Sequence, residues 1–280
     1  MIRPVLQDDD LLEDIERARF DAPEHLHLWW LGQSGFLLQW LGRHLLFDPY
    51  LSDSLTRKYA ATDKPHVRMT ERVIAPERLN FIDVVTSSHN HTDHLDRETL
   101  EALMRANPRM ELVVPEANRE FVVNRLEIVA DVPRGLEAGH SAAIAGFKIH
   151  AVPAAHNELE RDSSGRHKFL GYVVEAGPWT IYHSGDTVHY DGMEEWLQRR
   201  PIDIALLPIN GDQPERGVAG NLDGREAAKL AKDIGARMVI PCHYEMFEFN
   251  TATTDEFVAT ARSFGQPHQV LRCGERWSIA

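Results

Sequence analysis

A short run of metal-binding residue types occupies positions 89–94 of this 280-residue chain. It reads His89-Asn-His91-Thr-Asp93-His94 and places four side chains that can bind a metal ion within six positions. Neutral imidazoles and carboxylates, without a thiolate, suit borderline divalent ions such as zinc or manganese. A polar surface loop that happens to be rich in histidine is the alternative interpretation, and this spacing makes it the weaker one.

The spacing within this run indicates two binding positions. His89 and His91 are two residues apart, so on extended backbone their side chains lie on the same side and can bind one ion. The next two ligand residues follow a turn of the chain and can face a second ion. The β-branched run 81–87 predicts a strand before the motif, and a helix with Asp96 as its N-cap is predicted after it. The motif therefore belongs to a strand-to-helix loop, where α/β proteins place their functional sites.

Three further candidate ligands follow downstream. His156, Asp186 and His243 each come shortly after an apolar run that predicts a strand. Gly185 lets the backbone turn tightly beside Asp186. Taken singly, a histidine at a strand end is more often a structural hydrogen-bonding group than a ligand. The recurrence of this pattern, together with the motif at 89–94, favours the ligand interpretation and brings the set to seven side chains.

Seven ligands of this kind are enough for two ions, and they predict hydrolysis by a metal-activated water. Two neighbouring cations lower the pKa of a shared water enough to supply hydroxide at neutral pH. We expect Asp93 to orient this hydroxide and later to carry a proton, because a carboxylate beside cations stays ionised. Such a reaction requires no serine or cysteine nucleophile.

The arrangement resembles the metallo-β-lactamase superfamily, whose signature His-x-His-x-Asp-His matches residues 89–94. The resemblance covers nearly the whole chain and implies an α/β fold, a four-layer αβ/βα sandwich of two mixed β-sheets flanked by helices. It also implies His89, His91 and His156 on a first ion, Asp93, His94 and His243 on a second, and Asp186 as a bridge. Asp93 and Asp186 are then the predicted catalytic residues. Di-iron relatives carry an acidic residue at the position of His91, so the histidine favours hydrolysis over redox chemistry.

Within that superfamily, several segments are similar to the L-ascorbate-6-phosphate lactonase group. They include Trp29-Trp30-Leu31-Gly32, Tyr182-His183-Ser184-Gly185-Asp186 and Pro214-Glu215-Arg216-Gly217. The group implies a manganese-type ion and a phosphorylated sugar-acid lactone. The chain departs from it in being short and in carrying a plain histidine at position 156. A small anionic, phosphorylated lactone or ester is therefore the expected substrate, with three alternatives: a di-metal phosphodiesterase or nuclease, a non-catalytic metal-binding protein, or a di-iron redox protein.

Basic residues near the candidate ligands could bind the anionic part of a substrate. The long polar segment 51–76, which we expect to be a functional flap, contains Arg57, Lys58, Lys64, Arg68 and Arg72. A second set, Arg161, Arg166 and Lys168, follows His156. These side chains could bind a phosphate or carboxylate, or be solvated and paired with nearby acidic residues. The predicted substrate-binding residues are Arg216, Asn210 and Tyr244, the last as a donor to a developing oxyanion.

The rest of the chain predicts one layered α/β domain over residues 1–280, with an N-terminal helical segment, 1–25, packed on it. A chain of this length with 43% hydrophobic residues can bury a large core. Strands are predicted at 26–31, 35–40 and 44–47. A strand-loop-helix-strand unit begins near Ile82 and again near Ile202, which suits two facing sheets.

The charge and the cysteine content of the chain indicate which classes of partner it can bind and in which compartment it is expected. A net charge of −13 argues against a general nucleic-acid or acidic-membrane binder, because phosphates would be repelled. Cys242 and Cys273 provide no disulfide framework and fit a reducing cytoplasm. No segment has the composition of a signal peptide or the length of a membrane-spanning helix. We expect a small anionic molecule as the partner, and a homo-oligomer is compatible with the resemblance.

Overall fold

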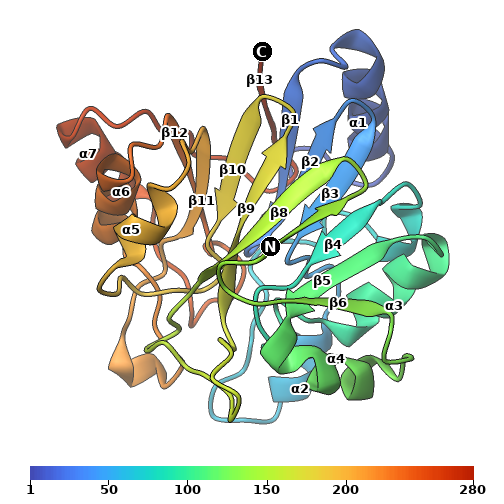
Figure 1. Cartoon of the computed structure of the whole chain (residues 1–280), viewed down its shortest axis with the longest axis horizontal. Helices are drawn as coiled ribbons and strands as arrows, with labels where there is room; N and C mark the ends of the chain where they lie inside the picture. The colour runs from blue at the N-terminus through green and yellow to red at the C-terminus, as the bar shows by residue number, and fades with distance from the viewer.

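Two mixed β-sheets lie face to face in the computed structural model, which describes residues 1–280 (Figure 1). The first sheet contains, in spatial order, β13 (Arg276–Ile279), β1 (Leu26–Gly32), β2 (Gly35–Trp40), β3 (Arg43–Phe47), β4 (Val84–Thr86), β5 (Glu111–Pro115) and β6 (Pro133–Leu136). The second contains β12 (Met238–Cys242), β11 (Ile204–Pro208), β10 (Trp179–His183), β9 (Leu170–Ala176), β8 (Phe147–Pro153) and β7 (Ser141–Ile144).

Helices cover the outer faces of both sheets, as Figure 1 shows. Beside the first sheet lie α1 (Asp9–Asp21), α3 (Arg97–Ala106) and α4 (Arg119–Leu126). Beside the second lie α5 (Met193–Leu197), α6 (Gly224–Asp233) and α7 (Asp255–Ser263). The connections add a short helix, α2 (Ser54–Tyr59), and three 3₁₀ turns, η1 (Pro76–Arg78), η2 (Glu116–Asn118) and η3 (Pro214–Arg216). The predicted sandwich of two mixed sheets flanked by helices is confirmed.

The core lies between the sheets and beneath the helices. Every residue of β1 and of β11 is buried, because helices cover one face of each sheet and the opposing sheet covers the other. A single cluster of 65 buried residues runs through both sheets. Leu11, Ile15 and Ala18 of α1 belong to this cluster, so the N-terminal helix packs on the same core.

Two helices begin at aspartate residues whose side chains cap their N-terminal ends. The side chain of Asp96 accepts a hydrogen bond from the N–H of Thr99 at 3.1 Å, which starts α3 directly after the metal-binding motif. Asp223 and Glu226 form a reciprocal capping box at the start of α6. The helix predicted to begin at Asp96 is therefore confirmed with its N-terminal end.

Strand directions bring the candidate ligands to one edge. β8 and β10 are both antiparallel to β9, and β10 is parallel to β11, which is parallel to β12. The carboxyl ends of β8, β10 and β12 thus lie at the same edge of the second sheet. In the first sheet β3 and β4 are parallel as well. The loops that follow these strands carry the candidate metal ligands and their partners.

The segment 51–76 is more structured than its polar sequence indicated. It contains α2, and Leu55 of this helix packs with Tyr50, Met246 and Phe247 in a small second cluster of buried residues. The segment is therefore fixed against the loop that follows β12. Among the helices of the chain, none combines the length and the apolar character that crossing a membrane requires.

Candidate metal centre

The loop after β4 places the first four candidate ligands at the boundary between the two sheets. The N–H of Ser87 donates to β5 at 2.9 Å, and the carbonyl of Ser88 accepts from the N–H of Leu170 in β9 at 3.0 Å. The carbonyl of His91 then accepts from the N–H of His94 at 3.1 Å, which closes a turn. The motif is consequently held by both sheets before α3 begins.

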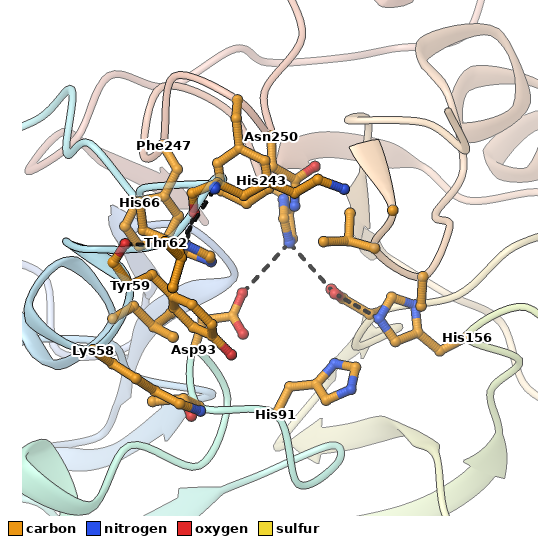
Figure 2. A pocket seen from close by; sticks show the side chains of 18 of the residues that line it. Lys58, Tyr59, Thr62, His66, His91, Asp93, His156, His243, Phe247 and Asn250 are labelled. Atoms are coloured by element: carbon orange, nitrogen blue, oxygen red, sulfur yellow. Dashed lines mark hydrogen bonds and ion pairs between the residues drawn. The ribbon is translucent and has the colours of Figure 1, made fainter. Parts of the chain in front are cut away.

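Three imidazoles form one cluster, the three-histidine group, which consists of His89, His91 and His156. One ligand atom from each lies within 4.8 Å of the others. The ring centroids of His91 and His156 are 5.0 Å apart, and Figure 2 shows the two rings side by side at one end of the site. His89 and His156 are buried, whereas His91 is exposed.

The other four candidate ligands form the mixed group, which consists of Asp93, His94, Asp186 and His243. Oδ1 of Asp186 lies 3.2 Å from His94 Nε2, and Oδ2 lies 3.4 Å from His243 Nε2. Oδ2 is also 3.6 Å from Nε2 of His156 in the three-histidine group. Asp186 therefore stands between the two groups, in the place of a carboxylate that can bridge two ions.

The backbone beside two of these ligands adopts a conformation that few residues accept. Gly185 has a φ of +61°, and a Cβ there would lie 2.5 Å from Cβ of Ser88, so only glycine lets the Asp186 loop pack against the motif. His243 has a φ of +62°, and its N–H donates to the carbonyl of Gln33 at 2.9 Å. Strained backbone of this kind is typical of functional sites.

In three of the candidate ligands, His89, His94 and His156, the ring nitrogen that faces away from the cluster has a partner of its own. Nδ1 of His94 lies 2.7 Å from Oδ2 of Asp48, and Nδ1 of His156 lies 2.7 Å from a backbone carbonyl. An ionised carboxylate or a carbonyl only accepts, so each Nδ1 carries a proton and each Nε2 can offer its lone pair to a metal. Nδ1 of His89 is 3.0 Å from Oγ of Ser88, which is itself bonded to Asp48.

Burial and charge set the protonation states of the ligands. Burial lowers the pKa of His89 well below the ordinary histidine value, and it lowers the pKa of both other members of the three-histidine group. Burial opposes ionisation of Asp186, but His94 and His243 outweigh it and hold the pKa of Asp186 well below its usual range. Neutral imidazoles and an ionised carboxylate are the forms that bind metals.

Several atoms of the cluster lack the partners that buried polar atoms normally have. Nε2 of His89, Nε2 of His94 and Oδ1 of Asp186 are buried without a hydrogen bond, at a cost of about 1–3 kcal/mol each. Burial lowers the pKa of His94, but Asp186 and Asp93 together raise it well above the usual value. Without a metal, His94 is therefore protonated. A divalent cation would replace this proton and would bind the three unpartnered atoms together. The residues therefore fit a metal centre with nitrogen and oxygen ligands.

A cavity of about 580 Å³ opens over both groups. Its lining includes five of the seven candidate ligands. It also includes an aromatic wall from the segment 51–76 and the loop after β12: Tyr59, His66, Phe247 and Phe249. The ring of His66 lies 4.3 Å from that of Tyr59 and 4.5 Å from that of Phe249, measured between centroids. Figure 2 shows Tyr59 and His66 on the opposite side of Asp93 from His156. The metal centre thus faces a pocket that is bounded on one side by aromatic rings.

Three basic side chains line the same cavity: Lys58, Lys64 and Arg125. Nζ of Lys64 donates to a backbone carbonyl at 2.5 Å. Arg125 donates to the carbonyl of Asn90 at 3.1 Å and to Oγ1 of Thr92 at 2.6 Å, which ties it to the motif. Nζ of Lys58 lies 4.9 Å from the centroid of the neighbouring tyrosine ring. None of the three forms a salt bridge, although the chain carries a net charge of −13.

Four other basic residues singled out in the sequence are paired with carboxylates. The pairs are Arg57–Glu98, Arg68–Asp53, Arg166–Asp162 and Lys168–Glu160. For these side chains the alternative interpretation, ion pairing within the protein, describes the structure. Lys58 and Lys64 are the basic residues of the segment 51–76 that line the cavity.

The structure does not bring the three predicted substrate-binding residues to the cavity lining. Arg216 donates to the backbone carbonyl of Asn210 at 2.5 Å and to a second backbone carbonyl at 2.9 Å. Nδ2 of Asn210 donates to Oδ1 of Asn250 at 3.0 Å. The hydroxyl of Tyr244, a buried residue, donates to the carbonyl of Leu271. These polar groups form hydrogen bonds within the protein that hold loops together.

Two residues of the site had no signal in the sequence. Arg125 lies on α4, far from the motif in sequence, and nothing in residues 119–126 indicates a binding residue. Gln33 lies in the turn between β1 and β2, and its Nε2 is 2.8 Å from Oδ2 of Asp93. The glycines that flank Gln33-Ser34 predicted a tight turn but not its contact with the motif.

Comparison with known proteins places these features in a family. The chain matches a family model described as a beta-lactamase superfamily domain over residues 43–244. A relative from Opitutus terrae, named a UPF0173 metal-dependent hydrolase, is 30% identical over 256 residues, which cover 89% of this chain and 98% of that protein.

Solved structures show the same fold. The isothiocyanate hydrolase from Delia radicum gut bacteria superposes with a TM-score of 0.70 at 22% identity, covering 90% of this chain and 100% of that one. CmlA, a diiron β-hydroxylase from Streptomyces venezuelae, gives a TM-score of 0.68 at 15% identity, covering 96% of this chain and 59% of that one. At these identities the likeness concerns the fold alone. The family match and the relative from Opitutus terrae go further, and by them this chain belongs to the metallo-β-lactamase superfamily as a metal-dependent hydrolase.

Proposed function

We propose that the protein hydrolyses a small anionic lactone or ester, with a phosphorylated lactone as the first candidate, by means of two divalent ions, zinc or manganese. The position of Asp186 carries this proposal: it lies 3.2 Å from His94 Nε2 and 3.6 Å from His156 Nε2, so it faces both ligand groups. Both groups open into one cavity of about 580 Å³, a volume that suits a small molecule.

The chain's own residues position the reacting groups. When bound, the ions supply a water of lowered pKa and polarise the carbonyl or phosphoryl oxygen of the substrate. Burial raises the pKa of Asp93, but His94 and other neighbouring histidines outweigh it, so the pKa is lowered and the carboxylate is ionised. Asp93 also lines the cavity. It can therefore accept a proton from the attacking water and pass it to the leaving oxygen.

Lys58 and Arg125 are the residues that we assign to the anionic part of the substrate. Both line the cavity beside the metal centre, and neither is paired with a carboxylate. Arg125 uses part of its guanidinium to hold the motif, and its remaining N–H groups suit a phosphate or carboxylate oxygen. Burial lowers the pKa of Arg125, so a bound anion would stabilise its charge.

The test is a hydrolysis assay of the metal-loaded protein with a phosphorylated sugar lactone and with the same lactone lacking the phosphate. We expect faster turnover of the phosphorylated compound and no turnover by Asp186→Ala. Lys58→Met should raise KM for the phosphorylated lactone about tenfold, as the loss of a charge-assisted contact implies, and should leave the neutral lactone unaffected. Arg57→Met is the matched control, because Arg57 pairs with Glu98 and does not line the cavity.

Two further substrates in the assay address other functions of the same centre. A phosphodiester tests for phosphodiesterase activity, because the unpaired side chains of Lys58 and Arg125 would bind its phosphate equally well. An isothiocyanate tests the substrate class named for one structure of the same fold, and it carries no anionic group. Failure to hydrolyse any anionic ester, or full activity of Asp186→Ala, would contradict the proposal.

The thiols bear on where this activity takes place. Cys242 and Cys273 are both buried and free. Free cysteines fit a reducing compartment, so we propose a cytoplasmic location.

A further inference from the structure

Gln33 reaches the mixed group from the turn between β1 and β2. The residue is fully buried and does not line the cavity. Its φ is +52°, in the left-handed region that glycine adopts with less strain. The carbonyl of Gln33 accepts hydrogen bonds from the N–H of His243 and from Nε1 of Trp30, both at 2.9 Å. The turn is therefore tied directly to a metal ligand.

The two ends of the Gln33 amide are treated differently by their surroundings. Nε2 lies 2.8 Å from Oδ2 of Asp93 and 3.0 Å from Nε2 of His243. Oε1 is buried and has no hydrogen-bond partner. Buried amide oxygens are rarely left without a partner, so each such case calls for a physical reason. Here one end of the amide contacts two metal ligands, and the acceptor end is unused.

A cation in the mixed group would change which end of the Gln33 amide can face Asp93 and His243. It would take the lone pair of His243 Nε2, which could then no longer accept a hydrogen bond from Gln33. Donor atoms bound to one cation at about 2.1 Å lie about 3 Å from each other. The end of the Gln33 amide stands at such distances from Asp93 and His243, 2.8 and 3.0 Å. A half-turn about the last side-chain bond exchanges the amide nitrogen and oxygen.

From these contacts we infer that Gln33 is a further metal ligand and supplies Oε1 to the cation of the mixed group. This inference rests on the proposed two-ion centre. The mixed group then offers three oxygen donors and two imidazoles, whereas the three-histidine group offers three imidazoles and shares only the carboxylate of Asp186. Oxygen donors suit manganese better than nitrogen donors do. We therefore expect the mixed group to bind manganese better, relative to zinc, than the three-histidine group does.

Two substitutions distinguish a metal ligand from a residue that only packs or donates hydrogen bonds. Gln33→Met keeps the length of the side chain but removes the amide oxygen. Gln33→Glu keeps an oxygen and removes the N–H donors. Gln39→Met is the matched control, because Gln39 is also buried with an unpaired Oε1 but contacts His44, at 2.8 Å, instead of a candidate ligand.

Each full-length protein is freed of metal and titrated with Mn²⁺ or Zn²⁺ in competition with a chromophoric chelator, without substrate. Bound ions are counted, and thermal melting of the metal-free proteins verifies that they fold. If Gln33→Met does not fold, Gln33→Asn replaces it, because the shorter side chain withdraws the oxygen and should cause the same loss.

We expect Gln33→Met to weaken the binding of one of two Mn²⁺ ions about tenfold or more, with a smaller effect on Zn²⁺. Gln33→Glu should retain or strengthen Mn²⁺ binding, and Gln39→Met should bind like the wild type. Unchanged Mn²⁺ affinity in Gln33→Met would overturn the inference. Equal losses in the Met and Glu variants would overturn it too, because they would assign Gln33 to hydrogen bonding with Asp93. No substrate is present, so these outcomes are separate from those of the hydrolysis assay.

Discussion

At the scale of single residues, the proton on one nitrogen of an imidazole decides whether the other nitrogen can bind a metal. Asp48 sets this choice for His94, because its Oδ2 lies 2.7 Å from Nδ1. Asp48 also accepts a hydrogen bond from the N–H of Ser88 at 3.0 Å, so the same carboxylate orients the motif backbone. A carboxylate behind a ligating histidine both fixes its ring and increases its basicity. The metal centre therefore extends beyond the atoms that would touch the ions.

We predict that Asp48→Asn weakens metal binding at the mixed group about 10- to 100-fold, the usual effect of removing such a carboxylate partner. The amide carries no charge and makes a weaker acceptor for Nδ1 of His94. Affinities for Zn²⁺ are measured by chelator competition. Asp14→Asn is the control, because Asp14 accepts a hydrogen bond from Trp29 Nε1 at 2.9 Å and is not among the candidate ligands. Equal affinities in the two variants would show that Asp48 has no such role.

The sequence identifies those residues of the site whose side chains have a distinctive chemistry. It does not identify residues of common types that reach the site only through the fold. The motif at 89–94 is recognisable because its donors are close together and of the types that bind metals. Gln33 and Arg125 have ordinary side chains, and only the fold brings them to the centre. Arg216 is the opposite case. Its charge and loop position predict a substrate contact, whereas its guanidinium donates hydrogen bonds to backbone carbonyls.

At the scale of the elements, β3 leads into the site and carries a buried titratable group. His44 on this strand is 3% exposed, and its Nε2 lies 2.8 Å from Nε2 of Gln39 on β2. Burial lowers the pKa of His44 from 6.5 to about 4, against the opposing effect of Asp83. The folded protein therefore keeps this imidazole neutral in a pH range where the unfolded chain protonates it.

We predict that His44 makes the protein less stable as the pH falls from 7 to 5. The unfolded state binds more protons in this window, so the free energy of unfolding decreases with decreasing pH, by about 2 kcal/mol from this residue. Urea unfolding of the wild type and of His44→Gln at pH 7 and pH 5 measures the effect. The variant should lose less stability over the window than the wild type. Identical losses would contradict the prediction, because they would mean that His44 is protonated to the same extent in the folded and the unfolded protein.

The elements that sequence reasoning found are those with strong local patterns. β1 to β3 alternate with glycine-containing turns, and Asp96 is a good helix cap, so these elements are predicted close to their observed bounds. β6 begins with Pro133 and contains Gly135, which remove the usual strand signal, and it forms at the edge through pairing with β5. The α2 helix lies in a polar segment and depends on packing against the loop after β12.

At the scale of the whole molecule, the site exists only where the two sheets meet. The motif at 89–94 follows the first sheet, whereas His156, Asp186 and His243 follow strands of the second. Direct hydrogen bonds cross the boundary: Tyr172 OH donates to the carbonyl of Ser87 at 3.0 Å, and further bonds join the Ser34 and Gln33 carbonyls to the second sheet. Bound ions would add to these bonds, because one centre would hold loops from both sheets together.

The number of ions bound per folded chain is the most direct test that ligands from the two sheets form one centre. The protein is equilibrated with Zn²⁺ or Mn²⁺, freed of excess metal, and analysed for metal content together with two variants. We predict two ions for the wild type and one for His156→Ala, which removes a ligand of the three-histidine group. His150→Ala should keep two, because that histidine contacts Glu175, at 2.6 Å, on the second sheet. A wild-type protein without bound metal, or an unchanged count in His156→Ala, would contradict the account.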